Sequence, residues 1–211
     1  MTSVAVIDYG MGNLHSIAKA LQHIPSSPVV NVSAKPEEIL AADRVVLPGV
    51  GAIGDCMSAL TQSGLDQVVL EVADSKPLLG ICIGLQIMLD ESEESGSTKC
   101  LGLFPGQVRK FPENMRDSHH NTIKIPHMGW NTVQQNHHPL WDNIADNSRF
   151  YFVHSYYATP SSPEHRAATS EYSDTFTCAL ARDNIFAVQF HPEKSQRYGL
   201  QLLDNFIRWD V

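Results

Sequence analysis

Short apolar runs alternate with amphipathic stretches through the first half of the chain. Residues 3–8, SVAVID, are apolar and rich in β-branched side chains, and residues 14–24 carry apolar side chains at helical spacing. The same order recurs three times, with strand-like runs at residues 28–32, 44–48 and 76–82 followed by helical runs at residues 35–41, 55–60 and 85–91. Strands that alternate with helices and are apolar on both faces predict a parallel sheet covered on both sides.

Beyond Cys100 the strand-like runs follow one another with turns in place of helices. They cover residues 106–111, 125–133, 149–158, 165–172, 176–181 and 185–190. This pattern predicts hairpins and mixed sheet, with Asp183-Asn184 as a two-residue turn and a closing amphipathic helix over residues 196–209. Because no break in composition divides the 211 residues, we expect residues 1–211 to form a single domain.

Composition and charge narrow the classes of function. Lys and Arg total 15 against 23 Asp and Glu, a formal net charge of −8, and no basic run interrupts this balance. Such a chain argues against nucleic acid or an anionic membrane surface as the main partner. The start of the chain has no basic segment ahead of an apolar core, and no stretch approaches the roughly 18 apolar residues of a membrane span, so we expect a cytoplasmic protein.

The cysteines of the chain are scattered. There are four, with no CxxC pair among them: Cys56, Cys82, Cys100 and Cys178. In a reducing compartment this spacing predicts free thiols rather than a disulfide framework or a zinc knuckle. Only Cys82 has flanking glycines, and it is therefore the candidate for chemistry.

Cys82 stands between Gly80 and Gly84 at the junction of a predicted strand and a predicted helix. The sequence GICIG is the nucleophile-elbow pattern with cysteine in place of serine. Glycines permit the sharp turn that lifts the side chain clear of the sheet, and the N-terminus of the next helix favours a thiolate and offers backbone N–H groups to an oxyanion. The alternative is a small buried cysteine whose glycines only allow the strand and helix to pack closely.

A thiol nucleophile for acyl chemistry needs a base, and the base needs a partner that orients it. His191 ends the apolar run 185–190 and precedes Pro192 and Glu193 in the sequence FHPE. Because proline fixes the local backbone, the imidazole and the carboxylate can project in similar directions. An isolated HPE sequence would indicate an exposed loop, but together with the GICIG elbow it predicts a catalytic pair.

The other motifs in the sequence are weaker candidates for a functional site. The pairs His119-His120 and His137-His138 have no Cys, Asp or Glu at ligand spacing, so no metal site is predicted. GMGN at residues 10–13 lacks the third glycine of a dinucleotide fingerprint and the GK[ST] of a P-loop, which excludes a nucleotide loop. LPGVGAIGD at residues 47–55 is open to two interpretations, a loop that brings backbone amides to a ligand or a flexible connection.

GICIGLQ and the downstream FHPEKS resemble the class I, or triad, glutamine amidotransferases. IDYGMGNLHS, LPGVGAIGD, PHMGWN and FVHSYY resemble more narrowly the glutaminase subunits of imidazole glycerol phosphate synthases, which belong to histidine biosynthesis. These motifs run from residue 7 to residue 195, so the resemblance covers nearly the whole chain. It implies an α/β fold, a doubly wound mixed sheet with helices on both faces and the nucleophile elbow at a strand–helix junction.

The resemblance also assigns residues. It makes Cys82 the nucleophile, His191 the general base and acid, and Glu193 the residue that orients the imidazole. It further implies that the amides of Val50 and Ile83 form an oxyanion hole. The implied glutamine pocket consists of Gly51, Gln86, Glu94, Ser155 and Tyr156. The implied partner surface consists of Asn13, Trp130 and Lys194. The elbow in this family often reads GICLGMQ, and the apolar replacements here leave the backbone role intact. The polar loop around residues 112–124 matches nothing in the family.

The implied reaction is the hydrolysis of glutamine to glutamate and ammonia through a Cys82 thioester, with no metal or organic cofactor. The implied partner, in a heterodimer, is a (β/α)8-barrel cyclase that receives the ammonia through a tunnel and forms imidazole glycerol phosphate and an aminoimidazole carboxamide ribonucleotide. A free glutaminase would waste glutamine, so we expect the partner to activate the chain. The segment PGVG at residues 48–51 is a suitable gate, because glycines ease rotation of the peptide plane that carries the Val50 N–H.

Three alternatives remain at this point. The glutaminase subunit of pyridoxal phosphate synthase shares the fold and triad but typically carries a PGGES-type loop where this chain has PGVGAIGD. A γ-glutamyl hydrolase or cysteine peptidase of the same fold would act on γ-glutamyl peptides rather than on free glutamine. A non-catalytic interaction subunit would have no need of an intact Cys82, His191 and Glu193.

Overall fold

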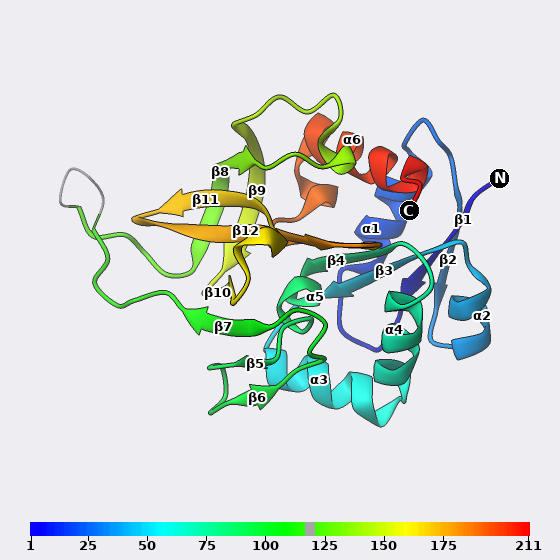
Figure 1. The fold of residues 1–211 in the computed structure, drawn as a ribbon, viewed down its shortest axis with the longest axis horizontal. Coiled ribbons are helices and arrows are strands. Elements are labelled where there is room, and N and C mark those ends of the chain that lie inside the picture. The colour runs from blue at the N-terminus through cyan, green and yellow to red at the C-terminus, as the bar shows by residue number, and fades with distance from the viewer. Residues whose placement is uncertain (117–120) are drawn as a thin grey trace.

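The computed structural model describes residues 1–116 and 121–211, and a large twisted sheet runs through it (Figure 1). The parallel part of the sheet has the order β2-β1-β3-β4-β13. Its strands are β1 (Ser3–Ile7), β2 (Val29–Ser33), β3 (Arg44–Gly49), β4 (Leu78–Cys82) and β13 (Ile185–Val188). The side chains of β4 and β13 are buried throughout, whereas β2 is a largely exposed edge strand, so the apolar runs mark the centre of the sheet.

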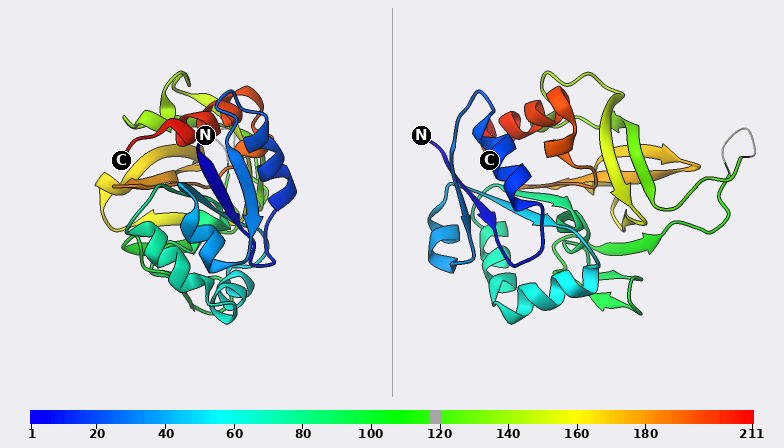
Figure 2. Two further views of the ribbon diagram at one scale, coloured as in Figure 1. Left: turned by 90° about the vertical axis from the view of Figure 1, so that its right-hand side faces the viewer. Right: turned by 180° about the vertical axis from the view of Figure 1, so that it is seen from behind.

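Helices cover both faces of the parallel strands, which confirms the doubly wound prediction (Figure 1). On one side, α1 (Leu14–Gln22) packs against α6 (Gln196–Arg208). On the other, α4 (Leu65–Ala73) packs against both α2 (Pro36–Ala41) and α3 (Ile53–Gln62). The two termini lie on the same side of the molecule (Figure 2).

The second half of the chain forms antiparallel and mixed sheet, as the sequence predicted. From β13 the sheet continues through β12 (Asp174–Arg182), β10 (Tyr156–Pro160), β7 (Gly106–Lys110), β5 (Glu91–Ser92) and β6 (Thr98–Lys99). A branch from β12 contains β11 (Arg166–Tyr172), β8 (His127–Gln135) and β9 (Ser148–His154). Arg182 pairs with Ile185, so Asp183 and Asn184 form the expected two-residue turn.

Short 3₁₀ turns complete the chain: η1 (Pro139–Trp141), η2 (Pro163–His165) and η3 (Pro192–Lys194). Buried aromatic rings fill the space between the branch and the parallel strands. The rings of Phe150 and Phe190 lie 4.2 Å apart, which joins β9 to the segment that follows β13. All four cysteines are free and buried, in agreement with the sequence analysis. Over the described residues, none of the helices has the length and hydrophobicity needed to span a membrane.

The predicted helix over residues 85–91 is wrong in extent. α5 (Ile83–Gln86) is a single turn, after which the chain bends away toward β5. The reason lies in residues 101–104, whose backbone N–H groups donate to the carbonyl oxygens of Ile87, Met88 and Leu89 at 2.8 Å. A longer helix would have used these carbonyls in its own ladder, so pairing with a later segment ends it. The helix α4 was not among the predicted elements.

Close packing of α6 on η3 gives a first prediction. A Cβ atom added at Gly199 would lie 1.9 Å from the carbonyl oxygen of Pro192, whereas one added at Gly54 in α3 would meet nothing closer than 3.6 Å. We expect Gly199→Ala to lower the free energy of unfolding by about 1–3 kcal/mol, because overpacking outweighs the better helix propensity of alanine. The matched control Gly54→Ala should leave stability unchanged or raise it slightly. Urea denaturation of both variants checks this, and equal effects would contradict it.

Candidate active site

Cys82 ends β4 and begins α5, in the elbow that the sequence predicted. It is 4% exposed and has a φ of 57°, a left-handed conformation that costs a non-glycine residue energy. The flanking glycines serve a different purpose from the one expected, because the left-handed turn belongs to the cysteine itself. A Cβ atom at Gly84 would lie 2.0 Å from the carbonyl oxygen of Leu47, so this glycine lets the elbow approach β3.

Glu193 lies in η3, His191 immediately precedes this turn, and both side chains are buried. The Nδ1 atom of His191 is 2.9 Å from a carboxylate oxygen of Glu193, and the two side chains are 3% and 0% exposed. The backbone of this segment is held by Ser195, whose hydroxyl donates to the His191 carbonyl at 2.6 Å and accepts from the Tyr151 N–H at 3.0 Å. The exposed-loop alternative is therefore wrong for this HPE sequence.

The environment favours a charged His191. Burial alone disfavours the imidazolium, but hydrogen bonding to Cys82 and Glu193 and the negative charges of both outweigh it and raise the pKa of His191 to about 10. The Nε2 atom is buried and has no hydrogen bond of standard geometry among the described residues. Resting contacts of this kind often tighten only when a substrate binds. The arrangement is that of a charged imidazole, oriented by a carboxylate, in the wall of the cavity that Cys82 also lines.

A cavity of about 330 Å³ opens beside the sulfur. Residues that the resemblance implied for catalysis, for the oxyanion hole and for the glutamine pocket line it, together with four others. The full lining is Val50, Gly51, Cys82, Ile83, Gln86, Glu94, Pro126, Val153, His154, Ser155, Tyr156, His191 and Lys194. Glu193 lies behind His191 and does not reach the cavity. The fold thus brings together segments that are more than a hundred residues apart in the sequence.

Two polar side chains of the cavity are held by backbone groups. A carboxylate oxygen of Glu94 accepts the backbone N–H of Ile53 at 2.8 Å, which ties the first turn of α3 to the cavity wall. Gln86 donates through Nε2 to the carbonyl of Tyr156 at 3.1 Å, and its own Oε1 is buried with no partner among the described residues. An unpaired buried acceptor on a residue that lines a cavity calls for an explanation, and a donor on a bound ligand would supply the missing partner.

The segment of residues 48–51 is anchored from behind. The hydroxyl of Tyr9 donates to the carbonyl of Pro48 at 2.7 Å, and the thiol of Cys56 donates to the carbonyl of Val50 at 3.4 Å. Burial raises the pKa of Tyr9 far above its ordinary value, so the hydroxyl keeps its proton. A Cβ atom at Gly49 would lie 2.8 Å from both the Tyr9 hydroxyl and Ile83 Cβ, so glycine is also required there for space.

The residues assigned to a partner surface lie near one another. Trp130 on β8 is 38% exposed and meets the edge of the Tyr151 ring at a centroid distance of 6.2 Å, and Lys194 Nζ lies 5.9 Å from the centre of the same ring. Asn13 is the N-cap of α1, which packs against η3. Tyr151, missed by the sequence analysis, links Trp130 to Lys194, and its outward position between buried Phe150 and Phe152 was its only signal.

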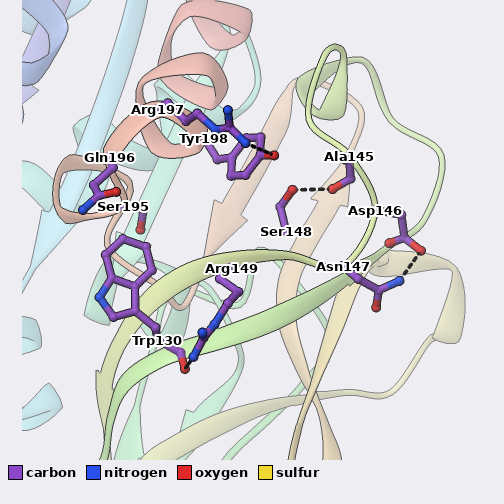
Figure 3. A pocket seen from close by; sticks show the side chains of 10 residues that line it. All are labelled: Trp130, Ala145, Asp146, Asn147, Ser148, Arg149, Ser195, Gln196, Arg197 and Tyr198. Atoms are coloured by element: carbon purple, nitrogen blue, oxygen red, sulfur yellow. Dashed lines mark hydrogen bonds between the residues drawn. The ribbon is translucent and has the colours of Figure 1, made fainter.

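A second cavity of about 470 Å³ adjoins Trp130 (Figure 3). Its polar side chains bond to one another or to nearby backbone, as Arg197 does with the Tyr198 hydroxyl and Arg149 with the Trp130 carbonyl. It contains none of the triad residues, so the cavity beside Cys82 is the better candidate for chemistry.

Of the two remaining histidine pairs, the structure describes His137-His138. His119 and His120 lie outside the described residues. His138 accepts the backbone N–H of Leu140 at 3.2 Å as a cap of η1, and burial lowers its pKa to about 4. Within residues 1–116 and 121–211, no three His, Cys, Asp or Glu side chains gather as a metal site would require.

The charge of His191 gives a second prediction. Its folded pKa of about 10 lies above the ordinary 6.5, so the charged ring contributes stability that is complete below about pH 6.5 and is lost as the pH rises through 10. Glu193→Gln removes one negative charge, and we expect the ring to lose its proton at a lower pH. Histidine side-chain NMR during a pH titration measures this midpoint. An unchanged midpoint would show that Glu193 does not hold the charge.

Comparison with known proteins shows which family and which relatives the chain resembles. The family model of class-I glutamine amidotransferases matches residues 5–209. The imidazole glycerol phosphate synthase subunit HisH of Methylococcus capsulatus is 58% identical over 212 aligned residues, which cover 100% of this chain and 98% of the relative. The HisH subunit of Nitrosomonas europaea is 55% identical over 99% of both chains.

Solved structures agree on the fold. A protein from Thermoplasma acidophilum, described as belonging to a GMP synthase, superimposes with a TM-score of 0.72 over 99% of this chain and 93% of its own. It is 21% identical, so it shows the fold alone. From the matched family model and from relatives that align along their full length, it follows that the chain belongs to the class-I glutamine amidotransferases, within the family of HisH subunits of imidazole glycerol phosphate synthase.

Proposed function

We propose that the chain is the glutaminase subunit of an imidazole glycerol phosphate synthase in histidine biosynthesis. The observation that carries this proposal is the buried Cys82, set beside a charged His191 and its partner Glu193 at the wall of one cavity. Full-length similarity to HisH subunits favours this function over that of a pyridoxal phosphate synthase glutaminase or a γ-glutamyl hydrolase.

In the first half of the reaction, the Cys82 thiolate attacks the side-chain carboxamide carbon of glutamine. A tetrahedral oxyanion forms, and we assign its stabilisation to the backbone N–H groups of Val50 and Ile83, two residues that line the cavity together with the sulfur. His191 gives its proton to the departing nitrogen. The C–N bond breaks, ammonia leaves, and a glutamyl thioester remains on Cys82.

In the second half, neutral His191 removes a proton from water, which attacks the thioester carbon. The C–S bond breaks, glutamate leaves, and the thiolate beside the imidazolium is restored. Glu193 keeps the ring in one orientation through its 2.9 Å contact with Nδ1 and stabilises the charge that the ring carries at the start and end of the cycle. No metal or organic cofactor enters these steps.

Substrate selection follows from the polar groups of the cavity. We assign the α-ammonium group of glutamine to Glu94, whose carboxylate lines the cavity and is already oriented by the Ile53 N–H. Gly51, Gln86, Ser155 and Tyr156 complete the pocket, and the unpaired Oε1 of Gln86 is an acceptor for a substrate N–H group.

We further propose that the partner is a (β/α)8-barrel cyclase, which docks on the surface that carries Asn13, Trp130 and Lys194 and receives the ammonia. Lys194 follows the triad glutamate directly in the sequence and also lines the cavity, so contact with a partner there would reach the catalytic geometry. The free thiols suit a reducing compartment, and we expect the complex to act in the cytoplasm.

The partner would also activate the chain. The Tyr9 and Cys56 hydrogen bonds hold the carbonyls of Pro48 and Val50, so the Gly49–Val50 peptide between them is the one that we expect a partner to reorient. A ligand on the partner shifts this equilibrium only if it binds the active arrangement more tightly. The loss of one oxyanion donor costs about 10²- to 10³-fold in rate in other enzymes.

The third prediction tests the chemistry. Cys82→Ala should abolish glutamine hydrolysis in the complex but leave the cyclase reaction intact when ammonium salt replaces glutamine, because only the nucleophile is lost. His191→Ala should be about as damaging, and Glu193→Gln should be milder than either. Glutamate release and product formation are measured in parallel. Loss of the ammonium-dependent reaction in Cys82→Ala would indicate a structural role for the cysteine instead.

The fourth prediction tests the partner surface. Lys194→Ala should reduce the stimulation of glutamine hydrolysis by the partner and its nucleotide ligand, with little change in the stability of the free chain. Lys35→Ala is the matched control, since Lys35 is an exposed lysine that pairs with Glu38 at the start of α2, next to the edge strand β2. Rates are measured for the free chain, the complex and the complex with ligand. Equal stimulation in both variants would show that Lys194 takes no part in activation by the partner. Equal rates for the free chain, the complex and the complex with ligand would exclude gating.

A further inference from the structure

Gln189 is a wholly buried amide beside the nucleophile, and the steps above make no use of it. It follows β13 and lies two residues before His191, with 0% of its surface exposed. Its backbone N–H donates to the carbonyl of Cys178 at 2.9 Å, which fixes the main chain. A buried carboxamide requires partners for its donors and its acceptor, so its neighbours determine what it does.

The hydrogen-bond pattern decides which end of the amide faces Cys82. Gln86 approaches the carbonyl of Tyr156 at 3.1 Å, and a carbonyl only accepts, so the approaching atom is the Gln86 nitrogen. The same nitrogen lies 2.9 Å from Gln189, where the atom must be the acceptor, Oε1. The remaining end of Gln189 is therefore Nε2, which lies 3.8 Å from the Cys82 sulfur. The Tyr156 carbonyl thus fixes both amides.

That carbonyl is itself held by a pair of buried histidines. Nδ1 of His154 lies 2.8 Å from the Tyr156 oxygen and must carry the hydrogen, which leaves Nε2 to accept from His127 Nδ1 at 2.9 Å. Burial lowers the pKa of His127 to about 4 and that of His154 to about 3, so both rings are neutral and each has one donor and one acceptor. A single direction of donation runs from His127 to the Tyr156 carbonyl.

We propose that Gln189 is a further catalytic residue, whose amide N–H donates a hydrogen bond to the Cys82 sulfur and stabilises the thiolate. Such a bond is stronger to a charged sulfur than to a neutral thiol or a thioester. It therefore favours the thiolate before attack and again when the sulfur leaves the thioester carbon. Gln86 is a positioning residue in this arrangement, since it acts on the sulfur only through the Oε1 atom of Gln189.

His191 and Gln189 then stabilise the sulfur in different ways. The imidazolium supplies a charge but must give up its proton during the reaction, whereas the amide N–H stays in place through the whole cycle. The role of Gln189 in the reaction rests on the proposed function, but the hydrogen bond to sulfur can be measured without glutamine.

The test is the pH dependence of Cys82 alkylation by iodoacetamide in the full-length chain, followed by mass spectrometry of the Cys82 peptide between about pH 5 and pH 10. Gln189→Met keeps the length of the side chain but has no N–H. We expect its alkylation at neutral pH to slow about tenfold and the midpoint of its profile to move to higher pH, as for the loss of one hydrogen bond to a charged group.

Two further variants keep the test decisive. Gln189→Glu keeps the acceptor for Gln86 but turns an oxygen toward the sulfur. It should therefore move the midpoint of the alkylation profile to a still higher pH. It also tests the hydrogen bond to sulfur if Gln189→Met does not fold. Asn205→Leu is the matched control, because Asn205 is a buried amide that donates to the carbonyls of Leu140 and Asp142. Its profile should match that of the parent chain.

Unchanged profiles in the Gln189 variants would overturn the proposal, and so would an equal shift in Asn205→Leu, which would indicate general loosening of the fold. Failure of the proposed function is a separate result. A parent chain that shows the expected alkylation profile but never hydrolyses glutamine with its partner would refute the glutaminase assignment and leave the hydrogen bond to sulfur standing.

Discussion

The parallel register of β3, β4 and β13 is the constraint on which the active site depends. Gly49 pairs with Cys82 across β3 and β4, and Val188 pairs with Ile81 across β13 and β4. Three chain segments therefore leave the sheet at the same edge, carrying the Val50 amide, the nucleophile and the Gln189–Glu193 segment. A shift of β3 or β13 by one residue against β4 would turn the side chains of the shifted strand to the opposite face.

Burial acts in opposite ways on neighbouring histidines. His127 and His154 bond to each other and to a carbonyl, and burial keeps them neutral. His191 is also buried, but the Glu193 carboxylate and the Cys82 sulfur hold its charge. Because a buried charge is stable only where it is paired, the contact with a carboxylate distinguishes His191 from His127 and His154.

Cys82 and the segment of residues 48–51 are held by different contacts. Cys82 stands in a strained turn packed against the backbone of β3, and its sulfur lies 3.8 Å from Gln189 Nε2. The 48–51 segment is anchored at two carbonyls from behind and faces the cavity with the half-exposed Val50. Under the proposed function, a partner that reorients the Gly49–Val50 peptide would change the rate without rebuilding the arrangement of Cys82, His191 and Glu193.

The sequence by itself determined the alternation of strands and helices in the first half of the chain apart from α4, the two-residue turn at Asp183 and Asn184, the elbow at Cys82 and the His191–Glu193 pair. These features depend on neighbours in the chain, where hydrophobic periodicity, glycine and proline act locally. Only the tertiary structure ended α5 after one turn, placed Tyr151 between Trp130 and Lys194, and joined Gln189 through Gln86 to the Tyr156 carbonyl. Each of these results from a hydrogen bond or ring contact between distant segments, and no periodicity records which distant group will satisfy a buried donor or acceptor.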